Sequence, residues 1–234
     1  MDGGSVAMTQ PYPIQLSLTG RACLMVGGGR VAARKVSRLI SCGAQVTVVS
    51  PDIDAELAEL AAAGRVNWVA RRYATGDMDG VFLVFGTTDS REVNARVAED
   101  AQRRGILCNI ADDPDASDFT LPALVLKGDV VLTVSTGGNS PALSRRIRQE
   151  LEQWLGDEYA VAARILGVLR ERLLARGHDP DGHRRTFARI LQGGLLSMLR
   201  ANDRSGVSKL LRRETGMDVM DSDDPALVEG RVRQ

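Results

Sequence analysis

The sequence has few of the residues from which disulfide frameworks and zinc sites are built. It has three cysteines in 234 residues, widely spaced and without a C-x-x-C pair, which argues against both. Cys23 and Cys108 fall in apolar runs that predict strands, so we expect buried, reduced thiols. Histidine is also scarce: only His178 and His183 occur. We expect both at the surface, and no resident metal site.

An excess of charge and a long apolar run are also missing. Lys+Arg and Asp+Glu each number 30, giving a net charge of +0, so nothing global favours nucleic acid or a membrane surface. An anionic ligand must then be held by a local basic cluster. No apolar run approaches the roughly 20 residues of a membrane-spanning helix, and residues 1–10 lack the pattern of a signal peptide. These features predict a cytoplasmic protein without nucleic-acid or membrane partners.

The first half of the chain alternates strand and helix patterns. Strands are predicted at 21–26, 45–49, 66–70, 81–85 and 106–110, and helices at 30–42, 52–63 and 90–104. This order is typical of an α/β fold with a Rossmann-type parallel sheet and helices on both faces.

The pattern changes at an acidic loop over 112–118. Strands at 119–126 and 130–135, joined by a turn at 127–129, predict a hairpin. A helix is predicted at 140–155, followed by helices at 159–175, 183–200 and 205–215, with a turn-rich segment at 178–182. The acidic tail from 221 is expected to be loose. A small α+β region therefore precedes a helical C-terminal region.

A glycine-rich loop lies between the first strand and the first helix. Residues 26–32 (VGGGRVA) fit G-x-G-x-x-A. Gly27 permits the tight turn, Gly29 lets the backbone approach a pyrophosphate, and Ala32 lets helix and strand pack closely. The phosphates would lie at the helix N-terminus, where free N–H groups favour anions. The loop predicts dinucleotide binding.

An acidic residue follows the second strand, as this interpretation requires. Asp52 lies about 20 residues beyond Gly29, where a carboxylate accepts hydrogen bonds from a ribose 2′-hydroxyl and disfavours a 2′-phosphate. This favours NAD over NADP. The alternative is that Asp52 caps the following helix.

A second ligand rim is predicted where the fourth strand ends, at 86–89 (GTTD). The carboxyl ends of strands face the ligand crevice in such sheets, although Asp89 or Ser90 could instead cap the next helix. The predicted cofactor-binding residues are Gly27, Gly28, Gly29, Arg30, Val31, Pro51, Asp52, Thr87, Thr88 and Asp89.

Several motifs together resemble one enzyme family. They are 12–14 (YPI), 26–35 (VGGGRVAARK), 86–89 (GTTD) with Asn94, 108–112 (CNIAD), 119–123 (FTLPA) and 135–141 (STGGNSP). In this order and spacing they resemble the precorrin-2 dehydrogenase/sirohydrochlorin ferrochelatase family, over about residues 11–155. The likeness fades beyond about 175. The chain ends without the uroporphyrinogen methyltransferase domain of some siroheme synthases, so we expect that step in another protein.

The resemblance implies two reactions. NAD+ takes a hydride from precorrin-2 to give sirohydrochlorin, and Fe2+, a substrate, then enters the tetrapyrrole as pyrrole protons leave. The family's motif assigns both steps to an Asp that is Asp112 here, a carboxylate able to accept a proton. The adjacent Asp113 is an alternative, and either acid could instead serve the turn.

The substrate carries eight carboxylates, so the resemblance implies local positive charge and anion sites. Arg148 is a further candidate, and a solvated basic helix face is the alternative for each cation. In some relatives a Ser in the 135–141 motif is phosphorylated, and this chain has Thr136 at that position. The predicted substrate-binding residues are Arg34, Lys35, Asn109, Thr136, Gly137, Gly138, Arg145 and Arg146.

The same resemblance implies an intertwined homodimer and a division of the chain. It gives an NAD-binding Rossmann domain at 1–112, a dimerisation region at 113–150, a helical C-terminal domain at 151–220 that covers the active-site cleft, and a flexible tail at 221–234.

Three alternatives remain open from the sequence. The chain could be a dehydrogenase with a separate chelatase, an NAD enzyme acting on another substrate, or an NAD-sensing regulatory domain. The last needs the glycine loop and the acid, but neither the 109–112 motif nor the hairpin.

Overall fold

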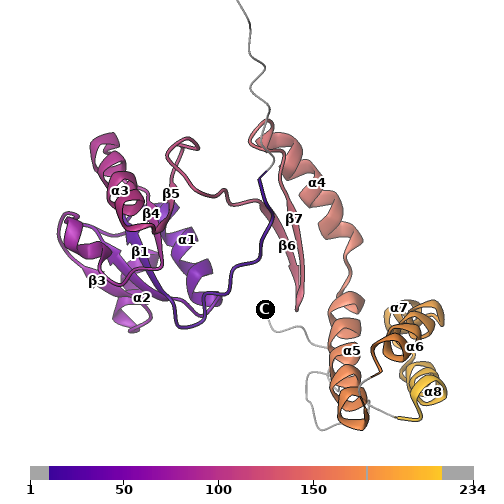
Figure 1. Cartoon of the computed structure of the whole chain (residues 1–234). Helices are drawn as coiled ribbons and strands as arrows, with labels where there is room; N and C mark the ends of the chain where they lie inside the picture. The colour runs from indigo at the N-terminus through magenta and orange to yellow at the C-terminus, as the bar shows by residue number, and fades with distance from the viewer. Residues whose placement is uncertain (1–10, 178, 218–234) are drawn as a thin grey trace, which may run out of the picture. The chain divides into compact units, whose positions relative to one another are not determined.

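The computed structural model describes residues 11–177 and 179–217 (Figure 1). The chain divides into two compact units, with the boundary between Leu121 and Pro122. The expectations for residues 1–10, His178 and the tail at 221–234 lie outside the described residues.

The first unit contains a five-stranded parallel sheet in the order β3-β2-β1-β4-β5. Val26 at the end of β1 is in register with Val49 of β2 and Gly86 of β4, so these strands end at one edge. The predicted Rossmann-type sheet is confirmed. Its strands are β1 (Ala22–Val26), β2 (Gln45–Val49), β3 (Asn67–Val69), β4 (Leu83–Gly86) and β5 (Leu107–Ile110).

Helices cover both faces of this sheet. Helices α1 (Arg30–Ser41) and α2 (Ala55–Ala62) share one apolar core with the face that carries Met25 and Phe85. Helix α3 (Arg91–Arg104) and the 3-10 helix η1 (Thr75–Met78) pack on the opposite face. Alternate residues of a strand point to opposite faces, so buried strands of this kind need apolar residues throughout.

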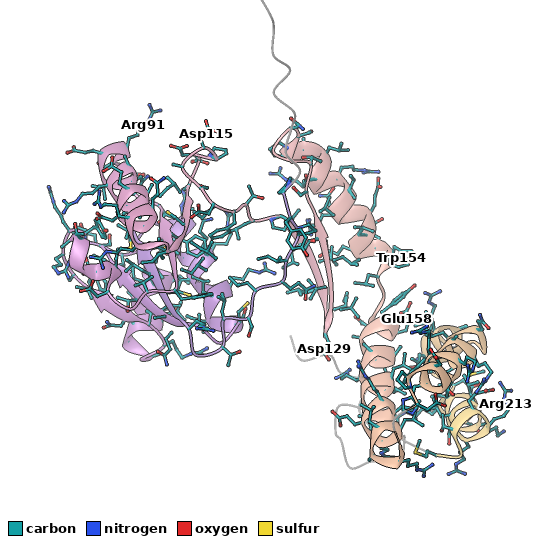
Figure 2. The ribbon with its side chains drawn as sticks, in the orientation of Figure 1. Arg91, Asp115, Asp129, Trp154, Glu158 and Arg213 are labelled. Carbon is teal, nitrogen blue, oxygen red and sulfur yellow. The ribbon has the colours of Figure 1, made fainter. Side chains whose placement is uncertain are left out.

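In its described residues, the second unit joins a β-hairpin to five helices. Strands β6 (Ala123–Lys127) and β7 (Val130–Val134) pair antiparallel, and α4 (Pro141–Trp154) packs against both. Helix α5 (Asp157–Arg176) shares an apolar core with α6 (Pro180–Gln192), α7 (Leu195–Arg200) and α8 (Arg204–Thr215). Figure 2 shows Trp154 at the end of α4 and Glu158 near the start of α5.

Two predicted elements were wrong. The strand expected at 119–126 begins only at Ala123, because the segment before it packs back on the first unit: the Phe119 carbonyl accepts a hydrogen bond from Asn109. The helix expected at 183–200 is two helices, α6 and α7, separated at Gly193 and Gly194. Gly194 has φ +93°, which a helix does not allow.

Among the described residues, no helix is both long and apolar enough to cross a membrane. Cys23 and Cys108 are buried free thiols, as predicted. Burial raises the pKa of Cys23 to about 11 and that of Cys108 to about 12.

Candidate functional site

The glycine loop and the rim after β4 meet at the point where the strand order reverses. The Gly27 amide donates to the Val49 carbonyl at 3.0 Å, and the Thr87 amide donates to the Val26 carbonyl at 2.8 Å. Gly27 has φ +114°, and a Cβ there would lie 2.7 Å from the Thr87 hydroxyl oxygen. Both the turn and the close approach of Thr87 therefore require glycine.

Gly28 and Gly29 serve different purposes. A Cβ on Gly28 would lie 2.2 Å from the Asp52 carbonyl oxygen, and the Asp54 amide donates to the Gly28 carbonyl at 2.7 Å. Gly28 is therefore a packing residue that ties the loop to the segment after β2. Gly29 is exposed, and a Cβ there would meet nothing within 4 Å. The open space beside Gly29 fits a ligand that approaches the backbone.

Helix α1 begins at this open position without a cap from any side chain in the described chain, and its first turn carries no acidic residue. By contrast, α2 and α3 are capped by the side chains of Asp54 and Ser90. The first N–H groups of a helix lack partners within it. Those of α1 are available to an anion, as a pyrophosphate site requires.

Neither Asp52 nor Asp89 caps the helix that follows it, because Asp54 caps α2 and Ser90 caps α3. Asp54 accepts the Glu56 amide at 3.1 Å, and Ser90 accepts the Val93 amide at 3.3 Å. Asp52 and Asp89 do not perform these tasks, and both are exposed at the same sheet edge. Pro51 is exposed beside Asp52.

Asn94 organises the rim in a way that the sequence did not assign. Its side-chain oxygen accepts from the Thr88 amide at 3.2 Å and from the Thr88 hydroxyl at 2.8 Å, while its nitrogen donates to the Thr88 carbonyl at 2.9 Å. The side chain is buried in α3. The only sequence signal was its place in the family motif, six residues beyond Thr88.

Asn109 and Asp112 lie where β5 ends. Lys35 of α1 donates to the Asn109 side-chain oxygen at 3.1 Å, and the Asn109 nitrogen donates to the Phe119 carbonyl at 2.9 Å. Asp112 is exposed and has φ +61°, a left-handed conformation that Asp tolerates better than most residues. Burial lowers the pKa of Lys35, Arg34 lowers it further, and Asp112 acts in the opposite direction.

The neighbouring acid, Asp113, serves the loop itself. Its carboxylate accepts the Ala116 amide at 3.1 Å, and its carbonyl accepts the Ser117 hydroxyl at 2.7 Å. The loop returns over the edge of β5, with Asp115 at its outer end (Figure 2). Of the two acids, Asp112 is better suited to face a ligand.

Five of the predicted substrate residues belong to the second unit: Thr136, Gly137, Gly138, Arg145 and Arg146. The Thr136 hydroxyl accepts the Ser140 amide at 3.1 Å and lies 3.0 Å from the Ser144 hydroxyl, so it holds the loop before α4. Gly137 and Gly138 are exposed with positive φ. The anion site predicted at this loop therefore depends on the backbone of its glycines, because the Thr136 hydroxyl is already engaged within the loop.

The predicted basic residues differ in their exposure and in whether they pair with a carboxylate. Arg30 and Arg34 are exposed on α1, Val31 between them is 43% exposed, and Arg145 is exposed on α4. On α4, Arg146 pairs with Glu150 and Arg148 with Glu152, each at 2.7 Å. Exposed i,i+4 pairs are weak, so Arg146 can exchange its partner for a ligand carboxylate.

No cluster of three or more His, Cys, Asp or Glu side chains that could hold a metal ion occurs in residues 11–177 and 179–217. His183 is partly exposed on α6.

Family models match two segments of the chain. Residues 14–123 match a model described as "Putative NAD(P)-binding", and residues 131–153 match one described as "Sirohaem biosynthesis protein central". The first covers the sheet with its glycine loop, and the second runs from β7 to α4.

Relatives of known name are similar over most of this chain. Siroheme synthase 3 of Aeromonas hydrophila subsp. hydrophila is 41% identical over 179 residues, covering 76% of this chain and 38% of the relative. The siroheme synthase of Chromobacterium violaceum is 40% identical over 192 residues, covering 82% of this chain and 41% of the relative. The chain thus spans about two fifths of the length of these curated relatives.

The fold also matches a solved structure of SirC, a precorrin-2 dehydrogenase, with a TM-score of 0.74 and 24% identity, over 88% of this chain and 100% of that one. The α/β fold and the helical region are therefore shared. The resemblance found in the motifs is confirmed: the chain carries an NAD(P)-binding module and a sirohaem biosynthesis central module, and over most of its length it is similar to siroheme synthases.

Proposed function

We propose that the chain oxidises precorrin-2 to sirohydrochlorin with NAD+ and then inserts Fe2+ to give siroheme. One observation carries the proposal. The 109–112 motif lies at the same sheet edge as the N-terminus of α1, which follows Gly29 and has no side-chain cap in the described part of the chain. A nucleotide-sensing domain needs the helix N-terminus but has no use for Asp112. The names of the relatives support the same substrate class.

The residues at the switch point fit a dinucleotide. The open backbone at Gly29 and the free N–H groups of α1 would hold its pyrophosphate. Asp52, exposed and not needed as a helix cap, would accept the ribose hydroxyls and favour NAD+ over NADP+. Bound NAD+ supplies the acceptor for the hydride that leaves precorrin-2.

Asp112 would carry the proton chemistry. Oxidation removes one hydride and one proton from precorrin-2, and the exposed carboxylate of Asp112 is the proton acceptor at this edge. In the second reaction, Fe2+ replaces two pyrrole protons, and the same carboxylate would receive them in turn. One acid can serve both steps because both need a base beside the macrocycle.

Substrate carboxylates would be held by exposed cations and backbone N–H groups. Arg30 and Arg34 on α1 supply charge in the first unit. In the second unit, Arg145 and Arg146 supply charge. The backbone N–H groups of Gly137 and Gly138 would donate hydrogen bonds, that of Gly137 in exchange for its 3.2 Å bond to the Ser135 hydroxyl. Guanidinium groups suit this task because they bind carboxylates through two parallel hydrogen bonds.

A homodimer in the cytoplasm is the proposed working form. The second unit exposes large apolar side chains on the hairpin and on α4: Leu126 is 53%, Leu143 51% and Trp154 57% exposed. A two-stranded hairpin is marginal by itself, and a second copy would cover these residues.

The direct test is anaerobic incubation of the purified protein with enzymatically prepared precorrin-2, with or without NAD+, followed by Fe2+. Sirohydrochlorin should form only with NAD+, and iron should enter faster than it does without protein. Asp112→Asn should abolish both steps, while Asp113→Asn serves as the matched control; Asn keeps the left-handed backbone accessible. Oxidation without accelerated iron entry would limit the chain to the dehydrogenase step. If no product forms that depends on NAD+, the proposal is refuted.

A further inference from the structure

Lys35 is half-buried on α1, unlike its exposed neighbour Arg34. Its ammonium lies 5.1 Å from the centroid of the Phe85 ring, within the range of a cation–π contact. Phe85 belongs to β4, in the core that α1 covers. The side chain therefore runs along the sheet and not out toward solvent.

The end of this side chain is already engaged by the 109–112 motif. The Lys35 ammonium donates to the Asn109 oxygen at 3.1 Å, and the amide nitrogen of Asn109 donates to the Phe119 carbonyl at 2.9 Å. The Phe119 ring meets Phe85 edge-on at 5.7 Å. Lys35, Asn109, Phe119 and Phe85 thus form a closed cluster, the lysine clamp, which joins α1 to both ends of the loop that carries Asp112.

A half-buried ammonium needs acceptors and negative charge nearby. The Asn109 oxygen supplies the acceptor, and Asp112 supplies negative charge: it opposes the effects of burial and of Arg34, both of which lower the pKa of Lys35. The attraction is mutual, so Lys35 also favours a position of Asp112 close to the clamp.

We propose that Lys35 is a positioning residue that sets the place of Asp112 through the lysine clamp, and is not an anchor for a substrate carboxylate. The inference rests on the proposed function only for the reaction that Asp112 serves. Arg34, one residue earlier and exposed, keeps the anchoring role. The two adjacent cations therefore have separable effects on catalysis and on substrate binding.

Steady-state kinetics of precorrin-2 oxidation by NAD+, measured in three variants of the full chain, distinguish an effect on catalysis from an effect on substrate binding. Lys35→Met keeps the aliphatic stem and loses the ammonium; kcat should fall between about tenfold and a hundredfold, with KM changed less than about twofold. Lys35→Arg should recover most of kcat. Arg34→Gln is the contrasting variant: because Arg34 is assigned to substrate binding, its loss should act mainly on KM.

A second measurement does not require turnover. Hydrogen–deuterium exchange of the resting protein should increase across residues 108–119 in Lys35→Met, and not in Arg34→Gln. Lys35→Gln replaces the methionine variant if that protein does not fold. A rise in KM with unchanged kcat, or unchanged exchange over 108–119, would overturn the proposal. If wild-type protein forms no sirohydrochlorin but the exchange difference appears, the proposed reaction fails and the clamp stands.

Discussion

Replacing two adjacent glycines of the nucleotide loop with alanine should have different effects: Gly28→Ala should lower stability, and Gly29→Ala should weaken NAD+ binding. A Cβ on Gly28 would lie 2.2 Å from the Asp52 carbonyl oxygen, about 0.8 Å closer than a tolerable contact, and 2.8 Å from the Ile53 side chain. The first obstacle is backbone, which the hydrogen bond from Asp54 to Gly28 holds in place. A Cβ on Gly29 would meet nothing within 4 Å.

Gly28→Ala should therefore destabilise the protein by about 1–3 kcal/mol, the usual range for overpacking. Each kcal/mol should lower Tm by about 2–4 °C in a chain of this size. Gly29→Ala should change stability by less than about 0.5 kcal/mol, because a poorer N-cap and a less flexible unfolded chain have opposite effects.

For cofactor binding, Gly29→Ala should be the more damaging of the two substitutions. If the pyrophosphate approaches the Gly29 backbone, the added methyl group should weaken NAD+ binding by about 1–3 kcal/mol, or roughly 5- to 150-fold in Kd. Differential scanning calorimetry and isothermal titration with NAD+ measure the two effects. Wild-type NAD+ affinity in Gly29→Ala, or an unchanged Tm in Gly28→Ala, would refute the assignment of these two roles.

Three further predictions concern a charge, the thiols and a buried guanidinium. Asp52→Ser should narrow the preference for NAD+ over NADP+ by tenfold or more in Kd, since the carboxylate repels a 2′-phosphate; an unchanged ratio would remove Asp52 from the site. Below about pH 10, a thiol reagent should modify Cys42 in the native protein but not Cys23 or Cys108, since burial raises their pKa values to about 11 and about 12; fast modification of all three would contradict their burial. Within the described chain, two buried nitrogens of Arg164 have no hydrogen-bond partner, so Arg164→Met should raise Tm, and a lower Tm would mean that the guanidinium is satisfied in solution.

The sheet could be predicted because its evidence is local. Apolar runs of strand length alternate with helical patterns, and the glycine loop marks the first crossover. The two errors arose from contacts distant in sequence. A Cβ on Gly193 would lie 2.6 Å from the Leu210 side chain, so α8 helps to decide where α6 ends. Periodicity cannot register such a contact.

The candidate site divides in the same way. Gly27, Gly29 and Asp52 could be identified from spacing, because one strand–turn–helix unit positions them. Other features depend on where side chains lie and could not be identified in this way. They are the cap of α2 by Asp54, the hydrogen bonds of Asn94 to Thr88 and the bond from Lys35 to Asn109. The sequence gives the charge of Lys35, which led to the prediction of a substrate-binding role, but it does not give the burial and the bond to Asn109 on which the proposed positioning role depends.

If this chain moves a hydride from precorrin-2 to NAD+, the two products must form in a fixed stoichiometry. Under anaerobic conditions, NADH and sirohydrochlorin are followed together by absorbance after mixing protein, precorrin-2 and NAD+. We expect one NADH to appear for each sirohydrochlorin, at the same rate, and both signals to be lost in Asp112→Asn. Sirohydrochlorin formed without NADH, or no product while NAD+ still binds, would contradict this expectation.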